Sequence, residues 1–516
     1  MKKRLLPLLC ASALTLALTA CGAQQTTQTD ITDAVALTFT DSGITAQDGT
    51  AGYEIDGTAL TITESGIYAV SGSCADGTIQ IKKGTTGVTL ILNGLDLTSG
   101  DSAAITCSKS GEVTILAADG TQNALSDTEQ NNDDNYPENE NAENAVIKCK
   151  DGSTVTLGGT GALTVTANGK NGIKSGAATE EDGEASLTIR DLTLHINAPV
   201  NDAINAEQHL NVESGTLTID AADDAIHCDL TLNIGADGTD GPTIDITSCY
   251  EGLEGAELNV LSGNITINAS DDCLNAANSD LTGYAFTLTI SGGTIDAYSS
   301  GGDGFDSNGE LTITGGTVVV WTANTADNEP LDADGTITVT GGTVLAAGGS
   351  SGMGMSLEAA QPCVIYGASS LGGTPGSAQS GSLIASGADF TIEDSGSTVY
   401  SGTARCNACF VLFSSADVTA DGPYTLKAGD SSAEGTAQSG TVSTGMGMGG
   451  GFRGGQKPDG EPPEGFDGQQ PSGEKPELPD GERPEPPDGQ GKSKDGRVPA
   501  GDNASDTNDP DTTQAA

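Results

Sequence analysis

A four-residue unit with acidic or amide residues recurs along the middle of the chain, and its oxygen atoms are the groups best able to do chemistry. Each unit begins with Asp, Glu or Asn, followed by a small residue, a large apolar residue and a polar residue. The units are 171–174, 202–205, 224–227, 251–254, 272–275, 303–306 and 329–332, and their apolar residues lie 21 to 31 residues apart. A period of this length is typical of stacked structural repeats.

Stacked repeats of this kind would bring like residues together in two columns. The first column holds the opening residue of each unit, namely Asn171, Asp202, Asp224, Glu251, Asp272, Asp303 and Glu329. The last column holds the closing residue, namely Lys174, Asn205, His227, Glu254, Asn275, Asp306 and Asp332. Strands of adjacent repeats lie about 4.8 Å apart. Carboxylates ~5 Å apart repel by about 3 kcal/mol at an effective dielectric constant of 20, so they either bind protons or hold cations.

Oxygen ligands at this density favour Ca²⁺. The candidate calcium ligands are Asp224, Glu251, Glu254, Asp271, Asp272, Asp303, Asp306, Asp332 and Asp334. The alternative is a solvated acidic edge that prevents strands of different molecules from pairing.

The elements that position these residues are expected to be short β-strands. Gly-Thr-type turns open a strand in several repeats, at Gly215, Gly263, Gly293, Gly316 and Gly342. The mature chain shows no convincing helical periodicity. Short strands without a helix to close each repeat predict an all-β parallel β-helix. A β-sandwich would need antiparallel hairpins every 8–12 residues and would not explain the recurring unit.

Two aromatic residues suggest a sugar-binding surface. Tyr298 and Trp321 occupy the same position after consecutive Gly-Thr turns. Their neighbours Ala297 and Val320 are expected to face inward, so alternation places the two rings outward. Stacked rings would form a platform for sugar faces. The alternative is that both rings cover a corner or pack under a loop.

Catalysis has weaker support than binding. A calcium-dependent uronate lyase needs a Lys or Arg base beside the metal, yet no Lys or Arg lies between Asp191 and Ala404, against 29 Asp and Glu. Lys174 is the basic residue on a column, away from the densest acidic cluster. Paired carboxylates can also hydrolyse glycosides, but the regular columns give no pair a distinct environment. We therefore expect a binding protein, with a lyase as the alternative and a structural adhesin or wall spacer as a further one.

Charge and composition narrow the partners. The chain has 516 residues and a formal charge of −52, which repels nucleic acid. Aromatic residues make up 3%, so a large aromatic-packed core is not expected. Cys107, Cys149, Cys228 and Cys273 are expected to be small buried hydrophobes. The Cys406 and Cys409 pair predicts either a local disulfide or free thiols. We expect a monomer.

The N-terminus predicts the location. Met1 to Arg4 is basic, Leu5 to Leu18 is an apolar run too short to span a bilayer, and Leu18-Thr19-Ala20-Cys21 resembles a bacterial lipobox. Cys21 is then the lipidated N-terminus, and the protein lies on the extracellular face of the cell membrane. An ordinary secretory signal is the alternative.

The expected domains follow from composition. Residues 1–21 form the lipoprotein signal peptide, 22–40 a polar tether, and 41–430 the β-helix domain with an acidic loop insertion at 126–143. Residues 431–516 form a disordered Gly, Pro and acidic tail.

Several short segments together resemble a known family. They are 62–68 (ITESGIY), 70–72 (VSG), 88–94 (VTLILNG), 123–127 (NALSD), 171–175 (NGIKS), 303–309 (DGFDSNG) and 351–353 (SGM). In this order they resemble the bacterial extracellular carbohydrate-binding β-helix proteins related to polysaccharide lyases, over residues 40–430. The resemblance implies a right-handed parallel β-helix, bound Ca²⁺, and binding of cellulose-like or acidic plant polysaccharides such as polygalacturonate. It also suggests Asp303 and Asp306 as calcium ligands.

Overall fold

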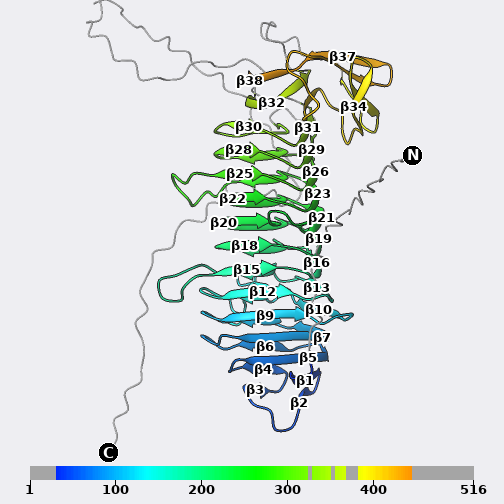
Figure 1. The fold of residues 1–516 in the computed structure, drawn as a ribbon. Helices are drawn as coiled ribbons and strands as arrows, with labels where there is room; N and C mark the ends of the chain where they lie inside the picture. Colours follow the sequence, from blue (N-terminus) through cyan, green and yellow to red (C-terminus); the bar gives the residue numbers. More distant parts are fainter. Residues whose placement is uncertain (1–30, 324–327, 350–354, 368–381, 444–516) are drawn as a thin grey trace, which may run out of the picture. The chain divides into compact units, whose positions relative to one another are not determined.

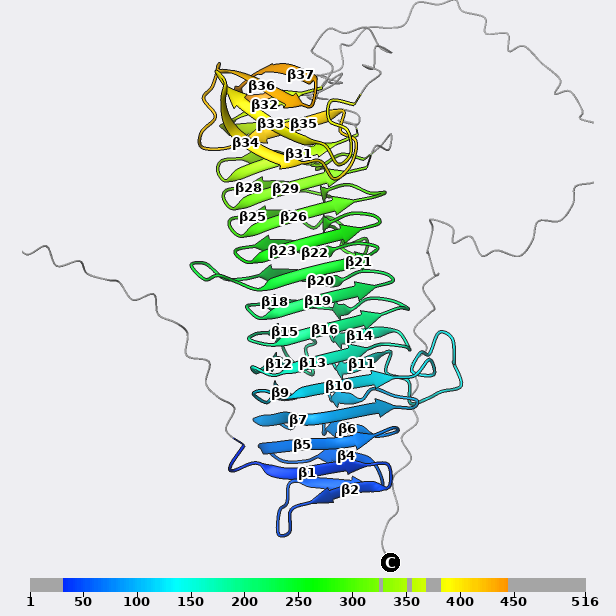
Figure 2. The same ribbon diagram turned by 90° about the vertical axis from the view of Figure 1, so that its right-hand side faces the viewer.

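The computed structural model of this chain describes residues 31–323, 328–349, 355–367 and 382–443. Within these residues the fold is all-β, without helices, which confirms the expected class. Thirty-four strands join in one mixed sheet and four form a separate antiparallel sheet. Figure 1 and Figure 2 show the strands of the large sheet stacked in chain order, from blue to green.

Most strands pair in parallel along three ladders. Ladder A contains β4 (Ala59–Ile62), β6 (Thr78–Ile81), β8 (Ile105–Cys107), β11 (Ala145–Cys149), β14 (Asn171–Ser175), β17 (Ile204–Ala206), β20 (Ile226–Ile234), β22 (Leu253–Val260), β24 (Leu274–Ala276) and β27 (Phe305–Ser307). Ladder B contains β9 (Glu112–Ala117), β12 (Thr154–Gly158), β15 (Ser186–Ile189), β18 (His209–Val212), the later parts of β20 and β22, β25 (Thr287–Ile290), β28 (Glu310–Ile313), β30 (Ile337–Val339) and β32 (Ser356–Tyr366).

Ladder C contains β1 (Val35–Thr40), β5 (Gly66–Cys74), β7 (Val88–Ser99), β10 (Gln122–Asp127), β13 (Ala162–Thr166), β16 (Thr193–Ala198), β19 (Thr216–Ala221), β21 (Thr243–Cys249), β23 (Asn264–Ala269), β26 (Thr294–Ser299), β29 (Thr317–Thr322) and β31 (Thr343–Gly348). Antiparallel pairing occurs at the two ends of the stack, through β2 (Gly43–Ala46), β3 (Tyr53–Asp56), β35 (Phe410–Ser414) and β38 (Gln438–Ser443).

The core lies between the ladders. At each inward-facing position, every strand of a ladder contributes one apolar residue, and these residues stack on one another. In ladder A, Ile173 pairs with Ile204, which pairs with Ile226 and then Leu253, and each of these side chains is fully buried. Since strand neighbours alternate between the two faces of a sheet, the polar residue after each of them points away from this core. The last column therefore lies on the outer side of ladder A.

A four-stranded antiparallel sheet near the end of the described chain covers part of ladder C. It contains β33 (Asp389–Asp394), β34 (Ser397–Thr403), β36 (Pro423–Ala428) and β37 (Ser431–Thr436). Its buried residues Phe390, Ile392 and Leu426 join one hydrophobic cluster with Trp321 and Leu345. This cluster buries the outer face of the last strands of ladder C.

Several expected segment boundaries were wrong. Strand β1 lies inside 22–40, where a polar tether was expected, because Leu37 and Phe39 alternate with polar residues and are buried. Strands β37 and β38 lie inside 431–516, where a disordered tail was expected, because they pair with β36 and β32. The acidic insertion at 126–143 was expected to be an exposed loop, but part of it is buried. Asn131 is buried there and donates to Asp127 Oδ2 at 2.8 Å.

No disulfide joins the cysteines of the described ranges, and Cys107, Cys149, Cys228 and Cys273 are buried as expected. Cys21 and the signal segment lie outside the described residues. Among the residues described, none forms a helix long and apolar enough to cross a bilayer.

Candidate functional site

The last column forms as the sequence predicts. Strand pairing places Lys174 beside Asn205, then His227, Glu254, Asn275 and Asp306 in successive repeats. Phe305 forms a parallel bridge with Leu331, the residue before Asp332, which continues the series. Residues up to 158 positions apart in the sequence therefore lie on one outer row of ladder A.

The first column also forms, and its carboxylates help to join the repeats. Asp202 Oδ1 accepts a hydrogen bond from the Asp224 backbone N–H at 3.3 Å, and Asp224 Oδ1 accepts one from Glu251 at 3.3 Å. Asp272 Oδ1 accepts one from the Asp303 N–H at 2.6 Å. These bonds fix one oxygen of each carboxylate and leave the other available to a neighbouring group.

The small residue between the columns is required by lack of space. A Cβ added to Gly304 would lie 2.4 Å from the Pro330 carbonyl oxygen and 2.4 Å from Val320 Cγ2. A Cβ at Gly252 would lie 2.2 Å from the Cys273 carbonyl oxygen. Neither glycine has a positive φ. Close stacking, rather than a special backbone bend, therefore keeps each first-column residue near its last-column partner.

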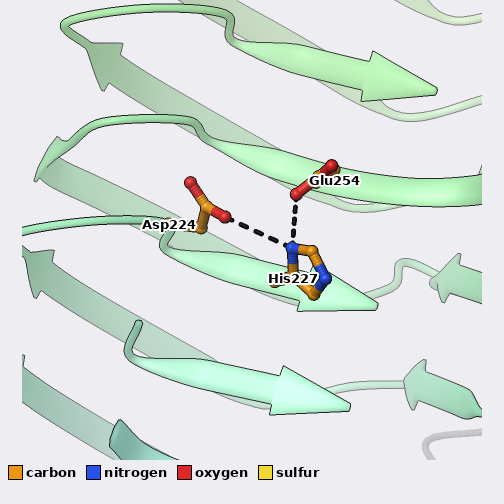
Figure 3. A group of neighbouring side chains, drawn as sticks. All are labelled: Asp224, His227 and Glu254. Carbon is orange, nitrogen blue, oxygen red and sulfur yellow. Dashed lines mark hydrogen bonds and ion pairs between the residues drawn. The ribbon is translucent and has the colours of Figure 1, made fainter. Parts of the chain in front are cut away.

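Two groups of side chains bring three ligand atoms within 4.8 Å of one another. One is Asp303, Asp306 and Asp332, and the other is Asp224, His227 and Glu254. Both groups use the same three positions, which are the first and last residues of one unit and the last residue of the next. Figure 3 shows the second group, with Asp224 and Glu254 both directed at the same ring nitrogen of His227.

His227 is surrounded by carboxylates. Its Nδ1 lies 3.3 Å from Asp224 Oδ2 and in direct contact with Glu254 Oε2, and its Nε2 lies 2.9 Å from Asp229 Oδ1. Burial alone would lower the pKa of His227, but the hydrogen bonds to Asp224, Asp229 and Glu254 raise it well above its usual value. Without a metal ion, the imidazole ring is therefore protonated at neutral pH.

Two members of the all-carboxylate group, Asp303 and Asp306, have raised pKa values. Burial, followed by repulsion from neighbouring carboxylates, raises the pKa of Asp303 to about 7 and that of Asp306 to about 6. The adjacent Asp272 has its pKa raised to about 8, mainly by burial. A raised carboxylate pKa means that the ionised form lacks compensation, which a bound cation supplies. The group is therefore suited to a cation.

The remaining predicted metal ligands have other contacts. Glu251 accepts from Asn275 Nδ2 at 2.9 Å, and burial raises its pKa to about 9. Asp271 is hydrogen-bonded to the Tyr250 hydroxyl. Asp334 is exposed, and neither close group includes it. The structure thus brings five of the nine predicted ligands into two close groups.

The expected aromatic platform was wrong. Tyr298 and Trp321 are paired in register, with Ala297 and Val320 fully buried, as predicted. However, Trp321 is only 1% exposed, because Phe390 of β33 packs edge-on against it at 5.9 Å between ring centroids. The Arg405 guanidinium lies 5.1 Å from the centre of the Tyr298 ring. The later antiparallel sheet covers the surface that was expected to bind sugar.

Comparison with known proteins identifies the family. The sequence profile of the carbohydrate-binding domain-containing proteins matches residues 56–235 and 238–404, which is more than half of the chain and includes both columns. This protein belongs to that carbohydrate-binding domain family. No curated protein matches the chain.

One solved structure is similar to this carbohydrate-binding domain protein. It is described as the polysaccharide lyase-like protein from C. thermocellum, a gadolinium derivative. The two chains are 22% identical, with a TM-score of 0.30 over 60% of this chain and 92% of the other.

Two residues of this carbohydrate-binding domain protein were missed by sequence reasoning. Tyr250 is 44% exposed and directly precedes Glu251, so an aromatic residue beside a unit was the available signal. Lys148 pairs with Lys174 and extends the last column toward the N-terminus. Burial, followed by the charge of Lys174, lowers the pKa of Lys148. It was missed because its own unit begins with Ala145 rather than an acid.

Proposed function

We propose that this protein is a calcium-dependent polysaccharide-binding protein of the cell surface. The observation that carries the proposal is the meeting of Asp303, Asp306 and Asp332, whose carboxylate oxygens lie within 4.8 Å of one another in a member of the carbohydrate-binding domain family. Binding of polysaccharide follows from the family, and the calcium requirement follows from this group.

The carboxylate oxygens of these three Asp side chains are ligands of the type that calcium binds. Ca²⁺ takes six to eight oxygen ligands at about 2.3–2.6 Å, so two ligand oxygens of one ion lie at most about 5 Å apart. The three Asp side chains supply oxygen donors from two repeats within that limit. The raised pKa values of Asp303 and Asp306 support a need for compensating positive charge at these two carboxylates, and residues 191–404 contain no Lys or Arg to supply it.

The residues present suit an acidic ligand. Bound calcium would supply coordination positions for the carboxylate and hydroxyl oxygens of a uronate polymer such as polygalacturonate, or for the hydroxyls of a cellulose-like chain. Asp303, Asp306 and Asp332 would hold the ion. Tyr250 directly precedes Glu251 of the first column, is exposed and is hydrogen-bonded to Asp271, so it offers an aromatic face for a sugar ring.

The proposal includes a specific architecture and a cellular location. Three parallel ladders with a period of 21 to 31 residues support a right-handed parallel β-helix. The Leu18-Thr19-Ala20-Cys21 segment supports a lipoprotein anchored through Cys21 on the extracellular face of the membrane, and we propose that the protein is a monomer.

A second candidate function is a calcium-dependent polysaccharide lyase, which the lowered pKa of Lys148 favours. In such a reaction a neutral Lys148 accepts the proton alpha to a uronate carboxylate. The adjacent carbon–oxygen glycosidic bond then breaks to leave a carbon–carbon double bond, and water protonates the leaving oxygen. However, six strand pairings separate Lys148 from Asp306, about 29 Å at the spacing of paired strands. One sugar residue cannot contact both, so binding is the better-supported function.

A retention assay tests these functions together. The full chain is passed over immobilised polygalacturonate with calcium and with a chelator, while the absorbance of unsaturated product is followed. Calcium-dependent retention without product supports the proposed function. Product formation lost in Lys148→Met would replace it with the lyase. Equal retention with and without calcium would contradict the calcium requirement, and no retention on any glycan would favour a structural adhesin.

A further inference from the structure

We propose that Asp224, His227 and Glu254 form a second metal site, which binds a transition-metal ion of the zinc class rather than calcium. The three side chains occupy the same repeat positions as Asp303, Asp306 and Asp332. Two residue types differ: Glu254 stands where the calcium candidate has Asp332, which keeps a carboxylate, and an imidazole stands at the position that Asp306 fills. The proposal does not depend on polysaccharide binding.

The donor set decides the class of metal. Calcium binds oxygen ligands and disfavours imidazole nitrogen. Zn²⁺ is bound by His nitrogen and by Asp or Glu oxygen, commonly with three protein ligands and one open position. One His and two carboxylates from two adjacent repeats provide such a set, with ligand atoms within 4.8 Å of one another.

The ring of His227 is held in the orientation that a metal ligand needs. Its Nε2 lies 2.9 Å from Asp229 Oδ1, and the backbone carbonyl of Asp229 accepts a hydrogen bond from Asn278 Nδ2 at 2.9 Å. Metal-binding histidines usually donate their other ring N–H to such a carboxylate, which fixes the tautomer. With the Nε2 N–H donating a hydrogen bond to Asp229, loss of the proton from Nδ1 on metal binding leaves the Nδ1 lone pair directed at Asp224 and Glu254.

The spacing of the ligand atoms also agrees with a tetrahedral ion. Zinc–ligand bonds of about 2.0–2.2 Å place neighbouring ligand atoms about 3.3–3.5 Å apart. Nδ1 of His227 lies 3.3 Å from Asp224 Oδ2, and Asp224 is oriented by the Glu251 N–H on its other oxygen. Glu254 Oε2 is in direct contact with Nδ1 and would move outward to share an ion.

The competing explanation is that a proton permanently occupies this place and His227 acts as an internal cation. In both explanations a positive charge compensates the carboxylates of Asp224 and Glu254. They differ in whether the group takes up a metal ion. A metal ion must displace the proton on Nδ1, so uptake would release protons and strengthen as pH rises. A permanent imidazolium would bind no metal.

Calorimetric titration of the metal-free full chain with ZnCl₂, in excess calcium, distinguishes the two. We expect one zinc site that is lost in His227→Gln and retained in His195→Gln, a control at an exposed histidine of β16. Asp229→Asn removes the orienting charge without removing a ligand, and should weaken zinc binding about 10- to 100-fold.

Thermal unfolding of each variant shows whether it is folded. Zinc binding that is equal in wild type, His227→Gln and Asp229→Asn would overturn the proposal, as would the absence of zinc binding by folded wild-type protein.

Discussion

His227 occupies in its repeat the position that Asp306 occupies three strand pairings later in the last column. Each has a first-column acid three residues before it and a last-column acid in the next repeat, Asp224 with Glu254 and Asp303 with Asp332. Parallel pairing of adjacent repeats brings the same unit positions together in both groups. The choice of cation is therefore expected to depend on the side chain at this single position.

Calcium bound by Asp303, Asp306 and Asp332 should stabilise the fold. Asp303→Asn together with Asp306→Asn removes two charged ligands and should abolish the rise in melting temperature that calcium produces. A ligand at 100 times its dissociation constant stabilises by about 2.7 kcal/mol, so the loss should be of this order. Differential scanning calorimetry with and without calcium measures it. Asp240→Asn, at an exposed loop position, is the control and should keep the full rise.

Exchanging the residue at the shared position should exchange the metals. His227→Asp makes the Asp224 group all-oxygen and should remove zinc binding while adding a calcium site. Asp306→His should weaken calcium binding at the Asp303 group and add a zinc site. Equilibrium dialysis with both metals, followed by elemental analysis, counts them. Unchanged metal content in both variants would show that this position does not select the cation.

The free energy of unfolding of the metal-free protein should depend on pH. Asp303 and Asp272 have pKa values raised to about 7 and about 8 in the fold, against a value of 3.8 for a free Asp side chain. The folded state then binds more protons than the unfolded state between these limits, so the free energy of unfolding falls as pH rises from about 4 to about 8. Calcium should reduce this slope.

Urea unfolding across this pH range, with a chelator present, measures the effect. Asp303→Asn should have a smaller slope than wild type, whereas Asp240→Asn should keep it. Stability that rises steadily over the same range would be inconsistent with uncompensated carboxylates in the columns.

Much of the site geometry was predictable, because one unit recurs and strand stacking fixes what lies beside it. The neighbours of His227 and Asp306 along the last column follow from sequence alone. The metal-selecting role of His227 was not, since Asp229 orients the ring from outside the unit. Burial of Trp321 agrees with the alternative that the rings pack under another segment, but the covering element was not predictable, because Phe390 lies 69 positions later in an antiparallel sheet with no repeat signal.

The two aromatic residues should separate stability from binding. Trp321→Ala removes a fully buried ring and should cost about 3–5 kcal/mol in the free energy of unfolding. Tyr250→Ala removes an exposed ring, so it should change stability little and weaken retention on polygalacturonate. Chemical denaturation and the retention assay measure the two effects. Strong retention by folded Tyr250→Ala would exclude that ring from sugar binding.

We claim that repeated side chains on ladder A form metal sites, and that the last-column residue determines which class of metal each site binds. Crystals of the protein grown with calcium and zinc together, measured on both sides of the zinc absorption edge, test it most directly. We predict a calcium ion bound by Asp303, Asp306 and Asp332, and a zinc ion bound by Asp224, His227 and Glu254. Density without either ion at both groups, or the same metal at both, would contradict the claim.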